Sequence, residues 1–279
     1  MHWIHVESAA YWISFVGAFL ACAVWESLRP LRETTATERR WGKHGVILIV
    51  CTVATVALYR ISPVVMAAHV SESKYGILNK PWLPYVVRCA VAILMLDLVR
   101  YLTHRLSHTV GALWRVHQVH HSDPEFDIST ALRVHPIEVL FTQGTYLLTV
   151  ALLAPPLVAV LLAELGSVLQ SFFIHANASL PGWLDKPMRA VLVTPNMHRI
   201  HHSEEVGEQF KNLSDIFGFW DRLFGTYADA PAAGDAGIVT GLKGFQNEES
   251  LGIGFMLAQP FRKNAETAAP ESILTGSGS

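Results

Sequence analysis

The sequence predicts an all-α fold: an integral membrane bundle of about four transmembrane helices with a histidine-rich helical cap on its cytoplasmic side. Three observations support this prediction. The 279 residues are 51% hydrophobic and only 16% charged, which is more apolar than an ordinary soluble domain. Several apolar segments reach the roughly 20 residues that a helix needs to cross a bilayer. Three histidine motifs lie beyond the ends of these segments.

The candidate spans follow one another along the chain. We expect the first two over residues 11–28 and 46–70, and a third over 82–102, which carries a few charged residues. The segment 139–174 is long enough to enter and leave the bilayer, with its turn at Pro155–Pro156. We expect about four transmembrane helices among these candidates.

The charge distribution predicts the orientation. The loop between the first two spans holds five basic residues, namely Arg29, Arg32, Arg39, Arg40 and Lys43. The positive-inside rule places this loop in the cytoplasm and the amino terminus outside. The third span then ends inside, and the 139–174 hairpin returns the chain to that side. All the histidine motifs are therefore expected on one cytoplasmic face of an integral membrane protein, in a bacterial inner membrane.

The remaining composition narrows the function. A net charge of −2 provides no basic surface for nucleic acid, so nucleic-acid binding is not expected. The three cysteines, Cys22, Cys51 and Cys89, lie in apolar stretches and resemble core residues more than a disulfide or redox pair. We expect one membrane domain over 1–264, with its histidine region at about 97–227, and a disordered tail over 265–279.

The histidine motifs predict a metal centre. They are His-x-x-x-His at His104 and His108, then His-x-x-His-His at His117, His120 and His121, and again at His198, His201 and His202. Residues three or four apart share a helix face, so each motif directs nitrogens to one side. Eight histidines exceed the four ligands that close one structural zinc site, which favours two metals. Neutral histidines without paired cysteines suit iron, with zinc as an alternative.

The ordered motifs resemble the fatty acid hydroxylase superfamily, also called the sterol desaturase family. They are HRLSH (104–108), LWRVHQVHHSD (113–123), TALRVHPIE (130–138), FIHAN (173–177), VTPNM (193–197), MHRIHHS (197–203) and WDRLFGTY (220–227). The resemblance covers most of residues 97–262. It departs from many relatives after Asn212, where Leu-Ser replaces an aromatic residue and glycine. It implies a non-haem di-iron enzyme that uses O2 and two electrons to hydroxylate or desaturate an unactivated carbon of a lipid.

The resemblance also implies residue roles. It makes the eight motif histidines metal ligands and favours His175, which matches a further family histidine, as a ninth, whereas His135 is as much a candidate for hydrogen bonding as for ligation. Asp97 lies two helical turns before His104, and an ionisable residue within a span is a functional candidate, although it could instead pair with a nearby arginine. Asn177 is a candidate for orienting an imidazole or a metal-bound water. We therefore predict that Asp97 and Asn177 act in catalysis.

The expected partners are a lipid substrate, membrane lipids and an electron donor. The chain has no Gly-x-Gly-x-x-Gly fingerprint and no cysteine set for an iron–sulfur cluster, so a separate cytoplasmic protein is expected to supply electrons. Hydroxylation is favoured over desaturation. Two alternatives stay open: a histidine-rich transporter or sensor of divalent metal, and a zinc-holding lipid-binding protein without oxidase activity. Transporter sites usually lie near the bilayer midplane, whereas these motifs follow span ends.

Overall fold

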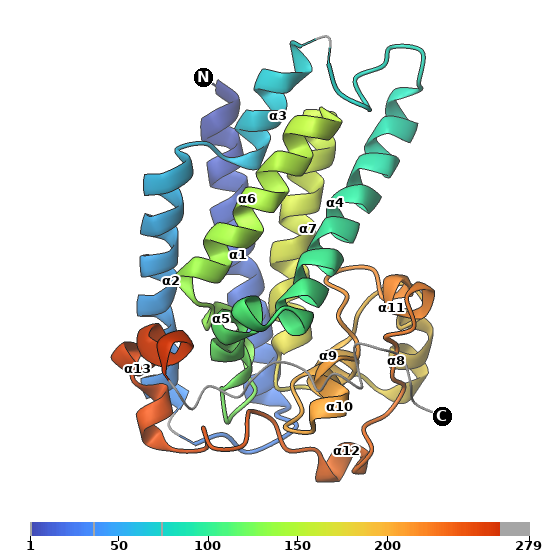
Figure 1. The fold of residues 1–279 in the computed structure, drawn as a ribbon. Coiled ribbons are helices and arrows are strands. Elements are labelled where there is room, and N and C mark those ends of the chain that lie inside the picture. Colours follow the sequence, from blue (N-terminus) through green and yellow to red (C-terminus); the bar gives the residue numbers. More distant parts are fainter. Residues whose placement is uncertain (1, 36, 74, 263–279) are drawn as a thin grey trace.

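Long helices standing side by side form the body of the protein (Figure 1). The computed structural model describes residues 2–35, 37–73 and 75–262. The long helices are α1 (His2–Leu28), α2 (Thr37–Tyr59), α4 (Tyr85–Thr109), α6 (Pro136–Leu153) and α7 (Leu157–His175). The short helix α3 (Pro63–Ser71) continues the direction of α2 after a bend at Arg60, whose φ of 53° breaks the helix.

Four helical segments are long and apolar enough to cross a bilayer. They are Glu7–Leu28, Thr37–Ser71, Pro136–Leu153 and Leu157–His175. Their outward side chains are apolar and exposed, as a lipid-facing surface requires, with Ile13 72%, Ile49 62% and Leu148 59% exposed. The predicted all-α membrane bundle is therefore confirmed. The predicted hairpin over 139–174 corresponds to α6 and α7, joined at Ala154, Pro155 and Pro156.

Helix α4 corresponds to the predicted span over 82–102, but it is not one of the four apolar segments. It runs beside α7 in Figure 1 and carries Arg88, Asp97, Arg100 and Arg105. Two of these charges are satisfied within the protein, since Asp97 binds the loop before α11 and Arg100 pairs with Glu164 of α7. Its crossing of the bilayer stays a prediction.

Apolar side chains join the long helices. Phe172 of α7 packs edge-on against Phe15 and Phe19 of α1, with ring centroids 4.9 and 5.5 Å apart. A second cluster, contributed by α3, α4, α6 and α7, contains Val64, Leu96, Val150 and Val160. These contacts hold α7 in the centre of the bundle, where its last residue, His175, reaches the cap.

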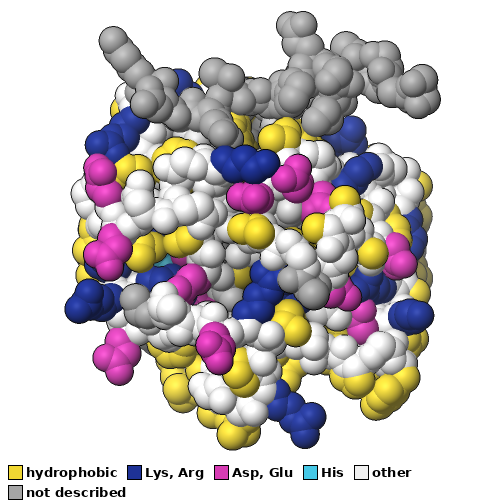
Figure 2. Space-filling view, turned by 90° about the horizontal axis from the view of Figure 1, so that it is seen from below, with side chains coloured by type: hydrophobic (Ala, Val, Ile, Leu, Met, Phe, Trp, Pro, Cys, Tyr) yellow, Lys and Arg dark blue, Asp and Glu magenta, His cyan; other side chains and the backbone are white. Residues whose placement is uncertain are grey.

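The cap below the bundle consists of short helices and loops (Figure 1). Its helices are α5 (Gly111–His121), η1 (Ile128–Leu132), α8 (Gly182–Met188), α9 (Pro195–His201), α10 (Val206–Gln209), α11 (Phe219–Leu223), α12 (Gly234–Gly237), η2 (Glu248–Leu251), α13 (Ile253–Ala258) and η3 (Gln259–Phe261). Figure 2 shows acidic and basic side chains interspersed on the lower face. The predicted disordered tail over 265–279 lies outside the described residues.

A buried ion cluster ties the cap to the bundle. Arg40, in the first turn of α2, donates to Asp123 and Asp127 of the loop after α5, with both N···O distances 2.6 Å. The side chains of these three residues are at most 2% exposed. Burial alone would raise the pKa of Asp123, but the Arg40 guanidinium holds that pKa well below its usual range. Asp123 is therefore a carboxylate, and the contacts of Arg40 with both aspartates fix the loop following three of the motif histidines.

Candidate metal centre

The structure brings the nine predicted ligands together at the lower end of the bundle. Helix α4 supplies two histidines in its last turns, α5 three, the end of α7 one, and α9 with the residue after it three. The start of α9 is fixed locally, because the Thr194 side chain accepts a hydrogen bond from Met197 N and Pro195 fits the first helical turn. The family-like motif VTPNM thus begins the helix that presents the third histidine motif.

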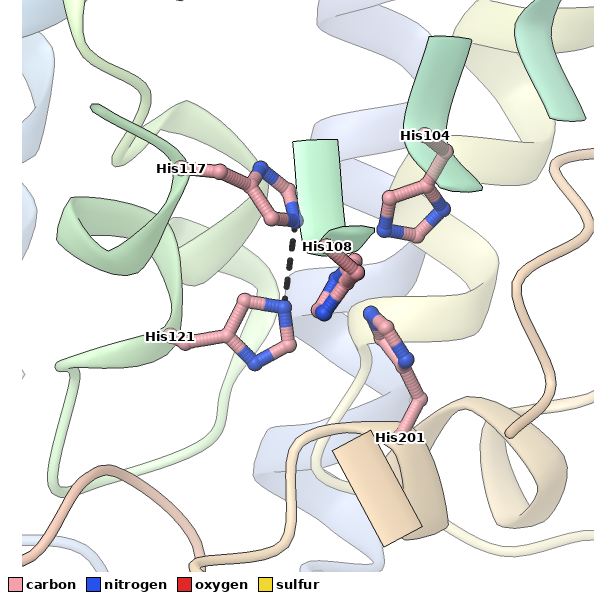
Figure 3. A group of neighbouring side chains, drawn as sticks. All are labelled: His104, His108, His117, His121 and His201. Atoms are coloured by element: carbon pink, nitrogen blue, oxygen red, sulfur yellow. Dashed lines mark hydrogen bonds between the residues drawn. The ribbon is translucent and has the colours of Figure 1, made fainter. Parts of the chain in front are cut away.

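The nine histidines form two groups. The first group is His104, His108, His117, His121 and His201, and the second is His120, His175, His198 and His202. Within each group the candidate ligand nitrogens lie within 4.8 Å of one another. Figure 3 shows the five side chains of the first group converging from α4, α5 and α9. The His-x-x-His-His spacing accounts for the division, since residues four apart share a helix face.

Backbone carbonyls fix the tautomers of three of the predicted ligands. His104 Nδ1 lies 2.8 Å from Leu213 O, His201 Nδ1 3.0 Å from Lys211 O, and His175 Nδ1 2.7 Å from Ser171 O. A carbonyl oxygen only accepts, so each Nδ1 carries the proton and donates it. Each Nε2 consequently keeps a lone pair available for a metal.

Several buried ring nitrogens either have no hydrogen-bond partner or face another histidine nitrogen. The Nε2 atoms of His104 and His201, and both nitrogens of His108, are buried without a hydrogen bond. In the second group His175 Nε2 lies 3.2 Å from His120 Nε2 and 3.0 Å from His198 Nε2. Buried polar atoms without partners are costly, and lone pairs that face one another repel unless something lies between them. The residues present therefore fit two first-row transition-metal ions.

The electrostatics keep the cap histidines neutral. Burial lowers the pKa of His121, His198 and His202 well below its ordinary value, and the neighbouring histidines lower each further. A second proton on each imidazole ring would place several positive charges within a few ångströms of one another. The neutral imidazole is the form that binds metal, so the pocket favours the ligating state over the protonated one.

Glu138 contacts one of the predicted ligands, a contact that the motifs do not indicate. Its Oε1 lies 2.6 Å from Nδ1 of His117, and its Oε2 is buried with no hydrogen-bond partner. Glu138 lies in the first turn of α6, and His135 is the N-cap residue before that helix. The helix brings it across to α5, a contact between residues 21 apart that spacing alone does not predict.

His135 lies outside both groups. Its Nδ1 accepts a hydrogen bond from Ile137 N at the start of α6, and its Nε2 lies 3.3 Å from Leu257 O. The first bond caps the amino end of α6, because the side chain of the residue before the helix accepts from a backbone N–H of its first turn. Of the two roles left open for this residue, the observed contacts correspond to hydrogen bonding.

The hydrogen bonds of the Asp97 and Asn177 side chains go to groups other than the histidines. The Asp97 carboxylate accepts from the backbone N–H of Ile216 and Phe217 and from Trp220 Nε1, at 2.8–3.2 Å. It pairs with neither Arg88 nor Arg100.

Asn177 exchanges hydrogen bonds with the backbone of Arg32, and so holds the loop after α1. The catalytic role predicted for Asp97 and Asn177 stays a prediction, and the contacts of both residues position loops.

A cavity of about 810 Å³ leads from the metal centre into the bundle. At its lower end it is lined by histidines of both groups, namely His104, His117, His120, His175 and His198. It extends between α1, α2, α6 and α7 as far as Tyr11 and Arg60. This volume lies within the range of ligand-binding pockets, and its length runs along the membrane-spanning helices.

The chain matches the model of a known protein family. Residues 89–226 match the model of the fatty acid hydroxylase family, and this segment contains all nine histidines. The chain belongs to the fatty acid hydroxylase family. The resemblance inferred from the motifs is thereby confirmed.

Named relatives of this hydroxylase-family chain act on lipids. It is 36% identical to alkylglycerol monooxygenase of Danio rerio over 141 residues, 50% of this chain and 30% of the relative. It is 27% identical to ornithine lipid hydroxylase OlsE of Rhizobium tropici over 180 residues, which are 64% of this chain and 52% of the relative. For methylsterol monooxygenase 1 of Rattus norvegicus the identity is 26% over 148 residues, which are 52% of this chain and 48% of the relative. The chain thus spans about a third to a half of these relatives. No solved structure matches it.

Proposed function

We propose that the protein is a membrane di-iron oxygenase that inserts oxygen into an unactivated carbon of a lipid. The observation that carries this proposal is the meeting of two buried histidine groups with one cavity that rises between the membrane-spanning helices. The related proteins named monooxygenases and hydroxylases support hydroxylation over desaturation. The lipid class, fatty acyl, sterol or other, is not specified by the histidines.

In this proposal the first group holds one iron and the second group the other, with zinc able to occupy the same nitrogens. Bound iron would supply the activation of O2, chemistry that no side chain can perform alone. The protein contributes the rest. The carbonyls of Leu213, Lys211 and Ser171 orient three imidazoles, and burial keeps the ligands neutral and water away from the reacting carbon.

The environment of the protein is part of the proposal. The five basic residues between Arg29 and Lys43, in the loop after α1 and the first turns of α2, support a cytoplasmic cap in a bacterial inner membrane, with the amino terminus outside. A separate cytoplasmic protein would then deliver electrons at the cap face, where Figure 2 shows both signs of charge. Membrane lipids would enter the cavity from the bundle side.

The direct test is oxygen incorporation. Purified protein loaded with iron is incubated with a lipid extract, a chemical reductant and isotopically labelled O2, and the lipids are analysed by mass spectrometry. The proposal expects lipid products that carry one labelled oxygen atom, absent with His120→Ala or His201→Ala. Iron-loaded protein that binds lipid but forms no labelled product would instead favour a lipid-binding protein, and readily exchanging metal would favour transport.

A further inference from the structure

A group of charged side chains interrupts the wall of the cavity. Arg100 of α4, Glu164 of α7 and Asp215 of the loop before α11 all line it. Arg100 Nη2 lies 2.7 Å from Glu164 Oε1, and Arg100 Nε lies 3.8 Å from Asp215 Oδ2. We call these three residues the Arg100 triad. None of them belongs to either histidine group.

Neighbouring side chains hold the triad in place. Ser167 of α7 donates a hydrogen bond to Asp215 Oδ2 at 2.7 Å. The Arg100 guanidinium lies over the ring of Tyr146 from α6, 4.4 Å from its centroid. Three helices and one loop thus fix the geometry, so the triad is a rigid feature of the cavity wall.

The triad lies close to the metal centre. Arg100 precedes His104 by four residues, which places it on the same face of α4 and about 6 Å further along the helix axis. Asp215 follows Leu213 by two residues, and the Leu213 carbonyl accepts the hydrogen bond from His104. A ligand at the triad is therefore above the first histidine group, and the cavity continues from it down to both groups.

The triad differs from the ion cluster whose role is structural. In the Arg40 cluster the side chains of Arg40 and Asp123 are each 1% exposed. In the triad Arg100, Asp215 and Glu164 retain 30, 24 and 15% exposure. Charged groups at membrane depth are costly and usually mark a functional site. Charges that only joined helices would be enclosed, whereas these are open to a ligand in the cavity.

We propose that the Arg100 triad binds the hydroxyl group of an amphiphilic lipid, while the hydrocarbon chain of that lipid extends down the cavity toward the histidines. Two carboxylates accompany one guanidinium, so the triad offers acceptors to a hydrogen-bond donor. The apolar residues that line the cavity below the triad, such as Phe15 and Phe172, suit the chain. This inference refines the proposed function, because it sets which end of the lipid lies beside the metals.

Lipid binding to metal-loaded protein in detergent tests the inference. The probes are a long-chain primary alcohol and the alkane of equal length, each displacing a fluorescent lipid. Because a hydrogen bond to a charged group contributes about 1.5–3 kcal/mol, Glu164→Gln and Asp215→Asn are expected to weaken alcohol binding at least about tenfold. Alkane binding should change by less than roughly twofold, since it makes no such bond.

Controls separate recognition from folding. Thr55→Val removes a polar atom of the same cavity outside the triad and should leave the alcohol-to-alkane ratio unchanged. Ser167→Ala, the mildest change, should lower that ratio roughly threefold even where the carboxylate variants fail to fold, because Asp215 loses the hydroxyl group that holds it in place.

An unchanged ratio in the variants that fold, or an equal loss for both probes, would overturn the inference. Because binding needs no turnover, absent lipid oxidation would refute only the proposed function.

Discussion

Glu138 Oε1 lies 2.6 Å from Nδ1 of His117, so a carboxylate contacts one of the predicted metal ligands. Both side chains are buried, at 9% and 5% exposure. The hydrogen bond fixes the ring of His117 and leaves its Nε2 directed at the first histidine group. Carboxylates that bind metal-ligating histidines in this way raise the basicity of the ligand and orient its ring.

Replacing Glu138 should weaken metal binding without removing a ligand. We expect Glu138→Ala to lower the affinity of the first group about 10–100-fold, the usual effect of losing such a partner. Competition between the protein and a chelator measures it. Glu205→Ala, at an exposed site that is 58% accessible, is the control and should keep the affinity of the unaltered protein. Equal affinities in both variants would mean that Glu138 does not support His117.

Asp97 provides a second test, because its observed contacts differ from the catalytic role predicted for it. Asp97→Ala leaves two backbone N–H groups and the Trp220 indole without their acceptor, at a cost of about 1–3 kcal/mol for a buried unpaired group. We expect a lower melting temperature with metal still bound. Lipid oxidation that disappears while melting temperature and metal content stay normal would show instead that Asp97 acts in catalysis.

The Arg40 cluster should control the attachment of the cap. Arg40→Met leaves Asp123 and Asp127 buried without their cation, which we expect to destabilise the protein by about 3–5 kcal/mol. Thermal unfolding measures the loss, and Arg40→Lys, which keeps the charge, should lose less. A melting temperature equal to that of the unaltered protein would contradict this role.

The stability lost in Arg40→Met should depend on pH. The pKa of Asp123 is held below its unfolded value by Arg40, so its stabilising contribution is present above pH ~3.9 and is lost as pH falls through the folded pKa. In Arg40→Met this contribution is absent. The difference in stability between the two proteins should therefore be largest above pH ~4 and shrink as pH falls below that value. A difference that stays constant as pH falls below ~4 would exclude the ion pair as its cause.

Much of the fold could be predicted because its signals are local. Hydropathy located the spans, the Pro155–Pro156 turn separated α6 from α7, and histidines four apart indicated shared helix faces. Helix α4 was harder, because its charged residues find partners only after folding. Arg100 meets Glu164, 64 residues away, and Asp97 meets a loop 119 residues away.

The motifs pair the histidines that lie four apart, but they do not show which of these pairs and which single histidines share a group. His117 and His121 belong to one group and His120 to the other, and the arrangement depends on where α4, α7 and α9 meet α5. The contacts of Glu138 and His135 depend in the same way on the position of α6. Tertiary contacts, which no single motif encodes, decide these roles.

The central claim is that two irons bind in separate histidine groups, and metal content measures it most directly. Iron and zinc are determined in purified protein expressed with iron, together with His201→Ala from the first group and His120→Ala from the second. We expect about two irons per chain in the unaltered protein, and about one in each variant, because each group has its own ligands. Unaltered protein with a single metal, or variants that both keep two, would contradict the account.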